Sequence, residues 1–338
     1  MADHASGLGG RPTLADVAAE TGFAISTVSR ALSKPERVNA RTRERIEAAA
    51  KQLGYTANTT ARALTSGRTR SVAVLVSDVT NPFYFGIIRG TQQELKTAGY
   101  TQLLVDTEES DDLEDAMLRR LRASYDGAII AASRLTDRRL AELAAQMPLV
   151  AINRQTRGVP NVFIDTPAGV DQAVEHLVSH GHRAIAYASG PPTSWPSERR
   201  WRAFTKAAGR WDVEVSRVGP FSPRQIQGAA AADAVLNTRA TACLAFNDLL
   251  AIGMLARFAE RGVRVPEDMS VVGCDDIFGA DFCHPPLTTI TAPITQAGRA
   301  AVSLLLAQLD RDGEPVRRTI TLPTHLTIRA SSGAASTA

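Results

Sequence analysis

The chain has 338 residues, of which 44% are hydrophobic and only 5% are aromatic, and this length is enough for two or three packed units. It has no apolar run of about 18 residues and no apolar signal-peptide core at its N-terminus, which argues against a membrane or secreted protein and predicts a cytoplasmic one. Its three cysteines, Cys243, Cys274 and Cys283, are too few for a disulfide framework or a paired zinc site, so we expect small buried residues and no metal.

The charge is unevenly distributed along the chain. Residues 1–70 hold eleven Lys/Arg and six Asp/Glu, a net charge of +5, whereas the remaining 268 residues hold 27 and 29, a net charge of −2. A basic N-terminal segment ahead of a nearly neutral body favours a small nucleic-acid-binding module joined to a larger domain.

The basic segment contains the signals of three short helices. Thr13 and Asp16 have the spacing of a capping pair at the start of the first helix, and Gly22 permits a tight turn after it. The third helix is predicted to begin after Asn39 and to end at Gly54.

The second helix, "FAISTVSRAL", is predicted to be amphipathic. Val28 and Leu32 lie four residues apart and face the core. The other face carries short hydroxyl, apolar and cationic side chains: Ile25, Ser26, Ser29 and Arg30. This pattern is typical of a helix-turn-helix, whose second helix enters the major groove, although an ordinary three-helix unit with a solvated face also satisfies it.

Three stretches resemble the N-terminal signature of the lactose/galactose repressor (LacI/GalR) family of bacterial transcription regulators: "PTLADVAAETGFAISTVSRAL", "RVNARTRERIEAAAKQLGY" and "NTTARALTSGRT". The resemblance continues through nearly the whole chain. It implies that bases are read by Ile25, Ser26 and Arg30, of which Arg30 is best suited to guanine. It also implies phosphate contacts, which fix register, from Thr13, Thr27, Ser29 and Asn39.

Residues 58–70 are too short and polar to form a stable isolated helix. They read as a linker, but the family resemblance implies a hinge helix that folds on DNA. Its DNA-facing residues are then Asn58, Ala61 and Leu64, with Leu64 entering the minor groove.

From Ser71 onward, short apolar runs alternate with helical patterns, which predicts an α/β fold with parallel sheets in two similar lobes. The resemblance implies a periplasmic-binding-protein-like (type I) effector domain in which the chain crosses between lobes three times. We place these crossings near 166–169, 289–292 and 317–319.

The predicted domain boundaries follow from these patterns. They are a helix-turn-helix domain, 1–57; a hinge, 58–70; an effector-binding and dimerisation domain, 71–330; and a disordered tail, 331–338. Lobe one is predicted to hold about 71–168 plus 292–317, and lobe two about 169–291 plus 318–330.

Ligands of open α/β sheets bind at the carboxyl ends of the strands, so the residues that follow each apolar run are the candidates. They are Asp78, Tyr84, Phe85, Asn153, Arg154, Trp195, Arg200, Asn247 and Asp275. Such a set suits a polyhydroxylated ligand such as a sugar. By resemblance, Arg200, Asn247 and Asp275 contact the effector, whereas we interpret Asp248 as a helix cap; Trp195 either stacks on a sugar or covers the lobe.

Catalysis is the competing class. The cluster His176, His180 and His182 has spacings that suggest a metal, but it lies at a predicted helix end, where cationic side chains are favoured. The chain has no "GxSxG" and no Walker motif, so we expect neither an enzyme nor a cofactor.

The sequence therefore predicts a transcription regulator that responds to a sugar or another small metabolite, most simply a repressor, that binds near-palindromic double-stranded operator DNA as a homodimer and has no membrane partner. Ligand-driven release and ligand-driven promotion of DNA binding are both compatible with the sequence. The alternative, a solute-binding protein of a sugar transporter, shares the two lobes but needs a signal peptide and no DNA module. The C-terminal "ASSGAASTA" lacks the Leu heptads of the family's tetramers, so we expect a dimer.

Overall fold

The computed structural model describes residues 12–33, 35–56, 68–310 and 318–336, and it divides into two compact units, Met1–Thr69 and Arg70–Ala338. The predicted hinge residues Asn58, Ala61 and Leu64 lie outside the described residues. None of the helices in the described ranges has the length and apolarity that crossing a bilayer requires.

The N-terminal unit consists of three α-helices and a short 3₁₀ turn. They are α1 (Leu14–Thr21), α2 (Ile25–Ser33), η1 (Pro35–Arg37) and α3 (Ala40–Leu53). The predicted capping box is present, because the Thr13 N–H donates to the Asp16 carboxylate at 2.7 Å and the Thr13 hydroxyl accepts from the Asp16 N–H at 3.4 Å. Gly22 ends α1 in the left-handed conformation, with φ of 73°, and so turns the chain into α2.

The core of this unit joins all three helices. Val28 of α2 is fully buried with Val17 of α1 and Ile46 of α3, as the predicted inward face of the second helix requires. Asn39 begins α3, and its side-chain oxygen accepts from the Arg41 N–H at 3.0 Å.

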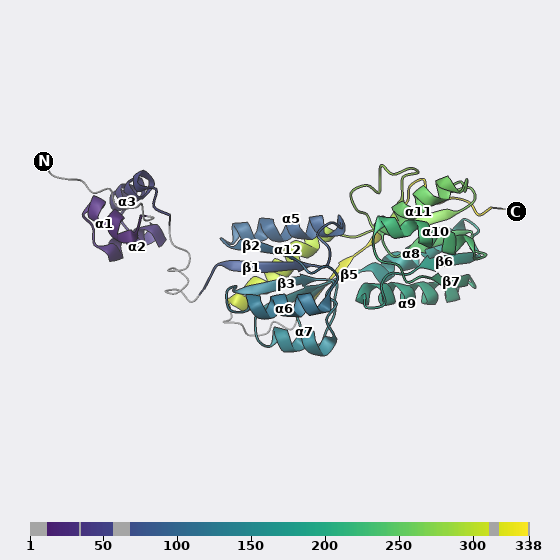
Figure 1. Ribbon diagram of the computed structural model, residues 1–338, viewed down its shortest axis with the longest axis horizontal. Helices are drawn as coiled ribbons and strands as arrows, with labels where there is room; N and C mark the ends of the chain where they lie inside the picture. Colours follow the sequence, from purple (N-terminus) through teal and green to yellow (C-terminus); the bar gives the residue numbers. More distant parts are fainter. Residues whose placement is uncertain (1–11, 34, 57–67, 311–317, 337–338) are drawn as a thin grey trace. The chain divides into compact units, whose positions relative to one another are not determined.

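Lobe one is built on a six-stranded parallel sheet of order β11-β5-β4-β3-β1-β2. The strands are β1 (Ser71–Val76), β2 (Thr101–Asp106), β3 (Gly127–Ala131), β4 (Leu149–Ile152), β5 (Asn161–Asp165) and β11 (Thr319–Pro323). Helices α5 (Phe83–Thr97) and α12 (Ile294–Leu309) cover one face, and α6 (Asp111–Leu121) and α7 (Asp137–Ala144) cover the other (Figure 1).

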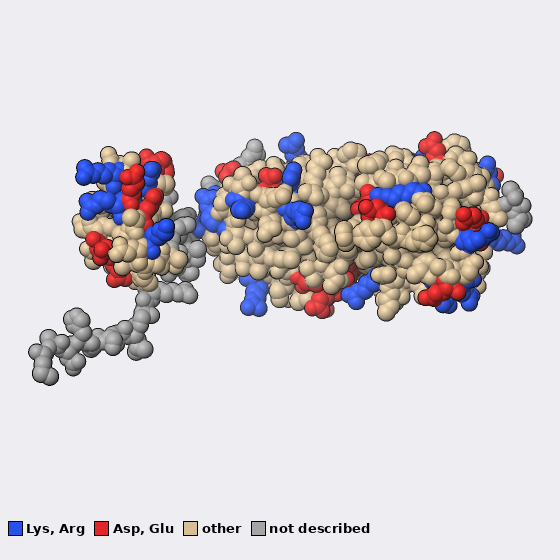
Figure 2. Space-filling model, turned by 90° about the horizontal axis from the view of Figure 1, so that it is seen from above, with Lys and Arg blue, Asp and Glu red and all other residues tan. Residues whose placement is uncertain are grey.

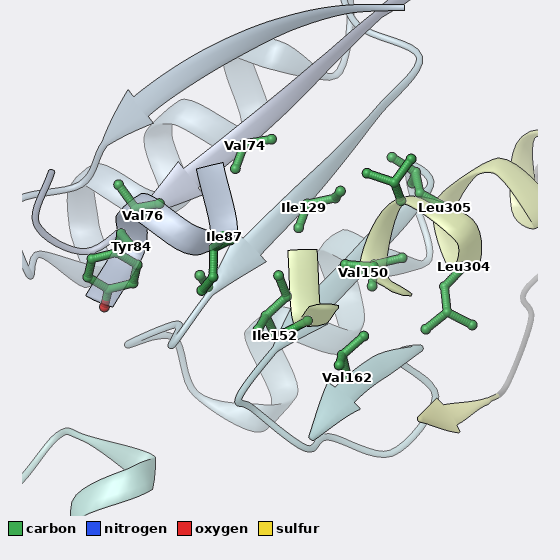
Figure 3. Packing of buried hydrophobic residues seen from close by; sticks show 14 of the residues in the cluster. Val74, Val76, Tyr84, Ile87, Ile129, Val150, Ile152, Val162, Leu304 and Leu305 are labelled. Carbon is green, nitrogen blue, oxygen red and sulfur yellow. The ribbon is translucent and has the colours of Figure 1, made fainter. Parts of the chain in front are cut away.

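The larger core of lobe one lies between its sheet and α5 and α12. Figure 3 shows Val74, Ile129 and Val150 of three neighbouring strands facing Ile87 of α5 and Leu305 of α12. Each of these side chains is fully buried, and burial of one aliphatic side chain contributes about 1.5–3 kcal/mol. This packing holds the carboxyl ends of the strands, and the loops that follow them, in fixed positions.

Lobe two repeats the plan with a six-stranded sheet of order β12-β10-β9-β8-β6-β7, in which only β12 is antiparallel to its neighbour. The strands are β6 (Ala184–Ala188), β7 (Glu214–Val218), β8 (Ala242–Ala245), β9 (Ser270–Asp275), β10 (Thr288–Thr291) and β12 (His325–Thr327). One face is covered by α8 (Thr166–Ser179) and α9 (Trp195–Arg210), and the other by α10 (Gly228–Leu236) and α11 (Asp248–Glu260) (Figure 1). The short 3₁₀ turn η2 (Gln225–Gln227) precedes α10. The fold class predicted from the sequence is confirmed.

The chain crosses between the lobes after β5, after β10 and after β11. The three crossings touch one another, since the Thr324 hydroxyl donates to the Asp165 carbonyl at 2.7 Å and a Cβ at Gly169 would overlap both Ile290 and Thr324. The third crossing lies at Thr324, so its predicted position at 317–319 is wrong. The reason is that β11 extends the lobe-one sheet beside β5, and the prediction passed over Pro323, which interrupts the strand pattern of "TITLPTHLT" just before the chain changes sheets.

The predicted disorder of 331–338 is wrong for the part of this tail that the structure describes. Ser331 is fully buried, its hydroxyl donates to the Val271 carbonyl at 2.6 Å, and it accepts from the Thr288 N–H at 2.8 Å. The small side chains that suggested disorder let the backbone lie close to the lobe-two sheet.

The histidines singled out in the sequence contact this tail. His182 is buried, with Nε2 3.1 Å from the Gly333 carbonyl oxygen and Nδ1 2.8 Å from the Thr241 hydroxyl, and the Nε2 of His176 is 2.9 Å from the Ser332 hydroxyl. Because the Gly333 carbonyl can only accept, the neutral Nε2–H form of His182 fits best. Burial lowers the pKa of both rings.

Candidate functional site: a polar helix face and an interlobe cavity

The predicted outer face of α2 is exposed. Ile25 is 53% exposed, Ser26 and Arg30 are exposed, and Thr27 and Ser29 are partly buried. The opposite face is held by the buried core of the unit, so the exposed side chains are presented by a fixed helix.

Thr13 and Asn39, the predicted phosphate contacts outside α2, are both exposed N-cap residues. The Thr13 hydroxyl also donates to the Asp16 carboxylate at 2.8 Å. Helix N-termini present free N–H groups and the positive end of the helix dipole, which suit a phosphate.

On the face of the larger unit shown in Figure 2, basic and acidic side chains lie in adjacent groups. Arg257 with Asp233, at 2.8 Å, and Arg264 with Asp268, at 2.6 Å, are two such pairs of that unit.

A cavity of about 30 Å³ lies between the lobes, at the carboxyl ends of their strands. Its lining comes from both lobes: Asn81, Phe83, Tyr84, Glu109, Ala132, Arg134 and Asn153 of lobe one, and Ser194, Pro196, Arg200, Pro223, Phe246, Asn247 and Asp275 of lobe two. A cavity of this size holds water but is smaller than a monosaccharide, so a sugar enters only if the lobes or the lining side chains move apart.

Five of the predicted effector residues meet in this cavity, namely Tyr84, Asn153, Arg200, Asn247 and Asp275. Tyr84 is buried, and burial raises the pKa of its phenol, so the ring stays neutral. Asn153 is in the left-handed region, with φ of 55°, and its side-chain oxygen is buried without a hydrogen-bond partner among the described residues.

Arg200 and Asp275 form a buried pair on the lobe-two wall. The Arg200 Nη2 donates to the Asp275 Oδ1 at 3.0 Å, and its Nη1 donates to the Phe246 carbonyl. Burial raises the pKa of Asp275 to about 6, against the opposing effect of the Arg200 cation, so the pair is charged at neutral pH. The Arg200 Nε has no partner within the described part of the chain.

Asn247 is both a helix cap and a cavity residue. Its Oδ1 accepts from the Leu250 N–H at 3.0 Å, and its Nδ2 donates to the Pro223 carbonyl at 3.2 Å. The interpretation of Asp248 as the cap is wrong, because its carboxylate turns inward and accepts from the Ile277 N–H at 2.9 Å and from the Thr289 hydroxyl at 2.5 Å. Burial raises the pKa of Asp248 to about 7.

Glu109 and Arg134 form a second, part-buried pair, which sequence reasoning missed. The Arg134 Nε donates to the Glu109 Oε2 at 2.9 Å, and its Nη1 donates to the Ala132 carbonyl at 3.2 Å. Both residues follow strands of lobe one, in "DTEES" and "AASRL", so the strand-end rule applied to those two runs would have found them.

Other lining residues that were missed carry weaker signals. Phe83 and Phe246 read as core residues in the sequence, and Pro196 and Pro223 as loop residues. Asn81 and Ser194 read as ordinary turn and cap residues.

Two predicted effector residues, Asp78 and Arg154, lie near the cavity without lining it. The Asp78 Oδ1 accepts from the Thr80 N–H at 2.9 Å, and its Oδ2 lies 3.4 Å from the Arg224 Nε of lobe two. Arg154 donates to the Leu135 carbonyl at 2.8 Å and pairs with Asp137.

The other two, Phe85 and Trp195, point elsewhere. Phe85 is 49% exposed and lines a separate surface groove, because it lies on the outer side of α5 from Tyr84. The Trp195 ring packs edge-on against Phe163 of lobe one, with 5.9 Å between ring centroids, so it covers a lobe contact and does not face the cavity.

Comparison with known proteins is consistent across the whole chain. Residues 13–58 match the model "Bacterial regulatory proteins, lacI family", and residues 174–332 match "Periplasmic binding protein-like domain". The chain is 32% identical over 305 residues to the transcriptional repressor CytR of Escherichia coli K12, covering 88% of this chain and 89% of that protein.

Two solved structures are similar over nearly the full length. The lac repressor dimer bound to operator and the anti-inducer ONPF is 28% identical, with a TM-score of 0.86, and covers 96% of this chain and 100% of its own. The complex of the transcriptional regulator CelR with cellobiose is 31% identical, with a TM-score of 0.70, and covers 95% and 100%. The chain therefore belongs to the lacI family of bacterial regulatory proteins, which are DNA-binding transcription regulators and not enzymes, and it carries that family's periplasmic-binding-protein-like effector domain.

Proposed function

We propose that the protein is a homodimeric repressor that binds near-palindromic operator DNA through α2 and responds to a small molecule, such as a sugar, bound between its lobes. The observation that carries the proposal is the interlobe cavity, lined by both lobes with polar groups that include an unpartnered donor and an unpartnered acceptor, in a chain that also holds a helix-turn-helix unit. A ligand that bridges the two walls stabilises one lobe arrangement over another, which is the requirement for control of a second site.

The DNA-reading role rests on the exposed face of α2. Arg30 supplies a bidentate donor for guanine, Ile25 an apolar contact for a thymine methyl, and Ser26 a short hydroxyl that permits close approach. Thr13, Thr27, Ser29 and Asn39 then contact phosphates and fix the register of the helix in the groove.

The operator proposal is tested by selecting binding sites from random duplexes and measuring affinity by fluorescence anisotropy at several salt concentrations. The selected site should be an inverted repeat, and affinity should fall steeply with salt as counterions are released. Arg30→Ala should lose about 1–3 kcal/mol per contact and relax the preference at one base in each half-site. Equal affinity of the wild-type protein for selected and random duplexes at physiological salt overturns the proposal.

The proposal of a homodimer is supported by the dimer that the similar lac repressor forms and by an apolar surface on the larger unit. Phe278 is 78% exposed and packs edge-on with the exposed Phe282, with 5.0 Å between centroids, and Phe85 lines the same groove of about 530 Å³ as Phe278. Exposed aromatic clusters of this kind mark protein contacts.

Sedimentation velocity checks the assembly. We expect a dimer at micromolar concentration and a monomer for the double variant Phe278→Ser, Phe282→Ser. A stable tetramer contradicts the proposed state, and an unchanged dimer in the double variant moves the interface elsewhere.

The proposal that the ligand is a sugar is supported by two relatives. CelR forms a complex with cellobiose, and a LacI-family regulator that is 28% identical to this chain has bound ribose. A thermal-shift screen of sugars and nucleobases identifies the ligand, because a molecule that binds only the folded state raises the melting temperature. Arg200→Ala should abolish the shift. A ligand whose shift survives that substitution binds outside the proposed cavity.

A further inference from the structure

The charged side chains that line the interlobe cavity are two cations and two anions: Glu109, Arg134, Arg200 and Asp275. Arg134 donates to Glu109 at 2.9 Å on the lobe-one wall, and Arg200 donates to Asp275 at 3.0 Å on the lobe-two wall. Each wall therefore carries its own compensated charge before any ligand enters.

The fold holds both pairs in place. The Arg134 side chain is only 5% exposed, its Nη1 donates to the Ala132 carbonyl, and its backbone N–H donates to the Glu114 carboxylate at 3.0 Å. Arg200 is fixed in the same way by the Phe246 carbonyl and lies with its Cζ 5.0 Å from the Phe246 ring centroid. Drawing Arg200 toward a new anion leaves the buried Asp275 carboxylate uncompensated, and drawing Arg134 away does the same to the part-buried Glu109 carboxylate, which is unfavourable in both cases.

The neighbouring charges are paired as well. Asp78 lies against Arg224 at 3.4 Å, and Arg154 pairs with Asp137 at 2.8 Å. Among the described residues that line the cavity, the buried side-chain polar atoms left without a partner are the Nε of Arg200, a donor, and the Oδ1 of Asn153, an acceptor. A hydroxyl group can accept the first hydrogen bond and donate the second, because it does both.

We propose that the ligand of this cavity is a small neutral molecule that bears hydroxyl groups, and that the Glu109–Arg134 pair excludes its anionic counterparts, such as phosphate esters and uronic acids. This inference rests on the proposed function, because it assigns the chemistry of the same cavity. A phosphate ester carries about −1.5 to −2 charges and must lose its water on entry, yet every lining cation is already bound to a carboxylate. A neutral hydroxyl compound can bond both unpartnered atoms, and its desolvation costs far less than that of an anion.

The test uses matched neutral and charged probes on the full-length protein. The probes are ribose and ribose 5-phosphate, glucose with glucose 6-phosphate and glucuronate, galactose with galacturonate, and adenosine and cytidine with their monophosphates. Thermal shift identifies the binding pairs, and calorimetry measures the affinity of both members. We expect at least one neutral probe to bind, with its charged partner weaker by at least about tenfold, the scale on which an uncompensated buried charge is felt.

The variant Glu109→Gln tests whether the Glu109–Arg134 pair is what excludes anionic ligands. It removes the counter-ion of Arg134 with little change of shape, so the charged partner should gain at least about tenfold relative to the neutral probe. The matched control is Glu108→Gln, which removes the adjacent exposed carboxylate outside the cavity lining and should keep the wild-type preference. If Glu109→Gln fails to fold, the preference of the wild-type protein decides alone.

Two results overturn the inference: a charged probe that binds the wild-type protein as tightly as its neutral partner, or no binding of any neutral probe at millimolar concentration. If folded Glu109→Gln keeps the wild-type preference for neutral probes, the Glu109–Arg134 pair does not exclude anions. The proposed function is contradicted by different results, namely the absence of selective operator binding or of an effector response, whatever the charge of the ligand.

Discussion

The outer face of α2 and the interlobe cavity solve recognition in opposite ways. On α2, Ile25, Ser26 and Arg30 are exposed on one rigid helix. In the cavity, the polar groups lie at or after the carboxyl ends of strands in both lobes, and their charges are already paired. On the roles proposed above, the difference teaches that a surface for a polyanion keeps its cation exposed, whereas a site for a small neutral molecule pairs its charges internally.

The largest expected effect comes from a substitution that unfolds the N-terminal unit and leaves the larger unit intact. Val28→Asp buries a charge in the core that holds α2, which the small N-terminal unit cannot absorb, so that unit should unfold and operator affinity should fall to the non-specific level. Proteolysis of the N-terminal unit and anisotropy on the operator measure this, while ligand binding to the larger unit stays at the wild-type level.

The same charge at Ala48, which is exposed on α3, is the control and should leave the unit folded. Loss of ligand binding in Val28→Asp would show that the two regions fold as one.

A smaller effect is expected at the crossings that join the lobes. Gly169→Ala should lower the free energy of unfolding of the larger unit by about 1–3 kcal/mol, because its Cβ overlaps Ile290 and Thr324. Gly209→Ala is the matched control, since Gly209 also lies in a helix but its Cβ meets open space, and it should stabilise by about 0.5–1 kcal/mol. Urea denaturation compares the two, and equal effects would mean that the crossings are not tightly packed.

The smallest expected effect is a pH dependence of the free energy of unfolding that comes from His182 in lobe two. Burial lowers the pKa of His182, so the folded state prefers the neutral ring. This contribution to stability is present above the ordinary pKa of about 6.5 and is lost as the pH falls through the lowered folded value, because the unfolded state then binds more protons.

Because the raised pKa values of Asp248 and Asp275 act in the opposite direction, the informative quantity is the difference between wild type and His182→Gln, which keeps a donor for Gly333. The wild-type advantage in the free energy of unfolding should shrink as the pH falls below about 6.5. A difference that is constant from pH 8 to pH 5 contradicts the assignment.

The sequence predicted what depends on local patterns. The capping pair of Thr13 and Asp16, the turn at Gly22 and the exposed face of α2 each follow from residues within a few positions of one another. The two parallel-sheet lobes followed from the repeated alternation of apolar runs and helical patterns.

What the sequence did not predict depends on contacts between distant residues. The direction of Phe85, away from the cavity that its neighbour Tyr84 enters, is set by how α5 packs on its sheet. The pairing of Arg134 with Glu109 joins two loops 25 positions apart, and the order of the C-terminal tail depends on hydrogen bonds from Ser331 to β9. No local pattern encodes such contacts.

The central claim is that the interlobe cavity controls the operator affinity of α2. The most direct measurement is operator affinity with and without the ligand found by thermal shift, for the wild-type protein and for Asp275→Asn. The account predicts that the ligand changes wild-type affinity by about five- to 150-fold, a coupling of about 1–3 kcal/mol, whereas Asp275→Asn keeps ligand-free operator affinity and loses the response. A full response in a folded Asp275→Asn protein, or a ligand that binds the cavity without changing wild-type operator affinity, would contradict it.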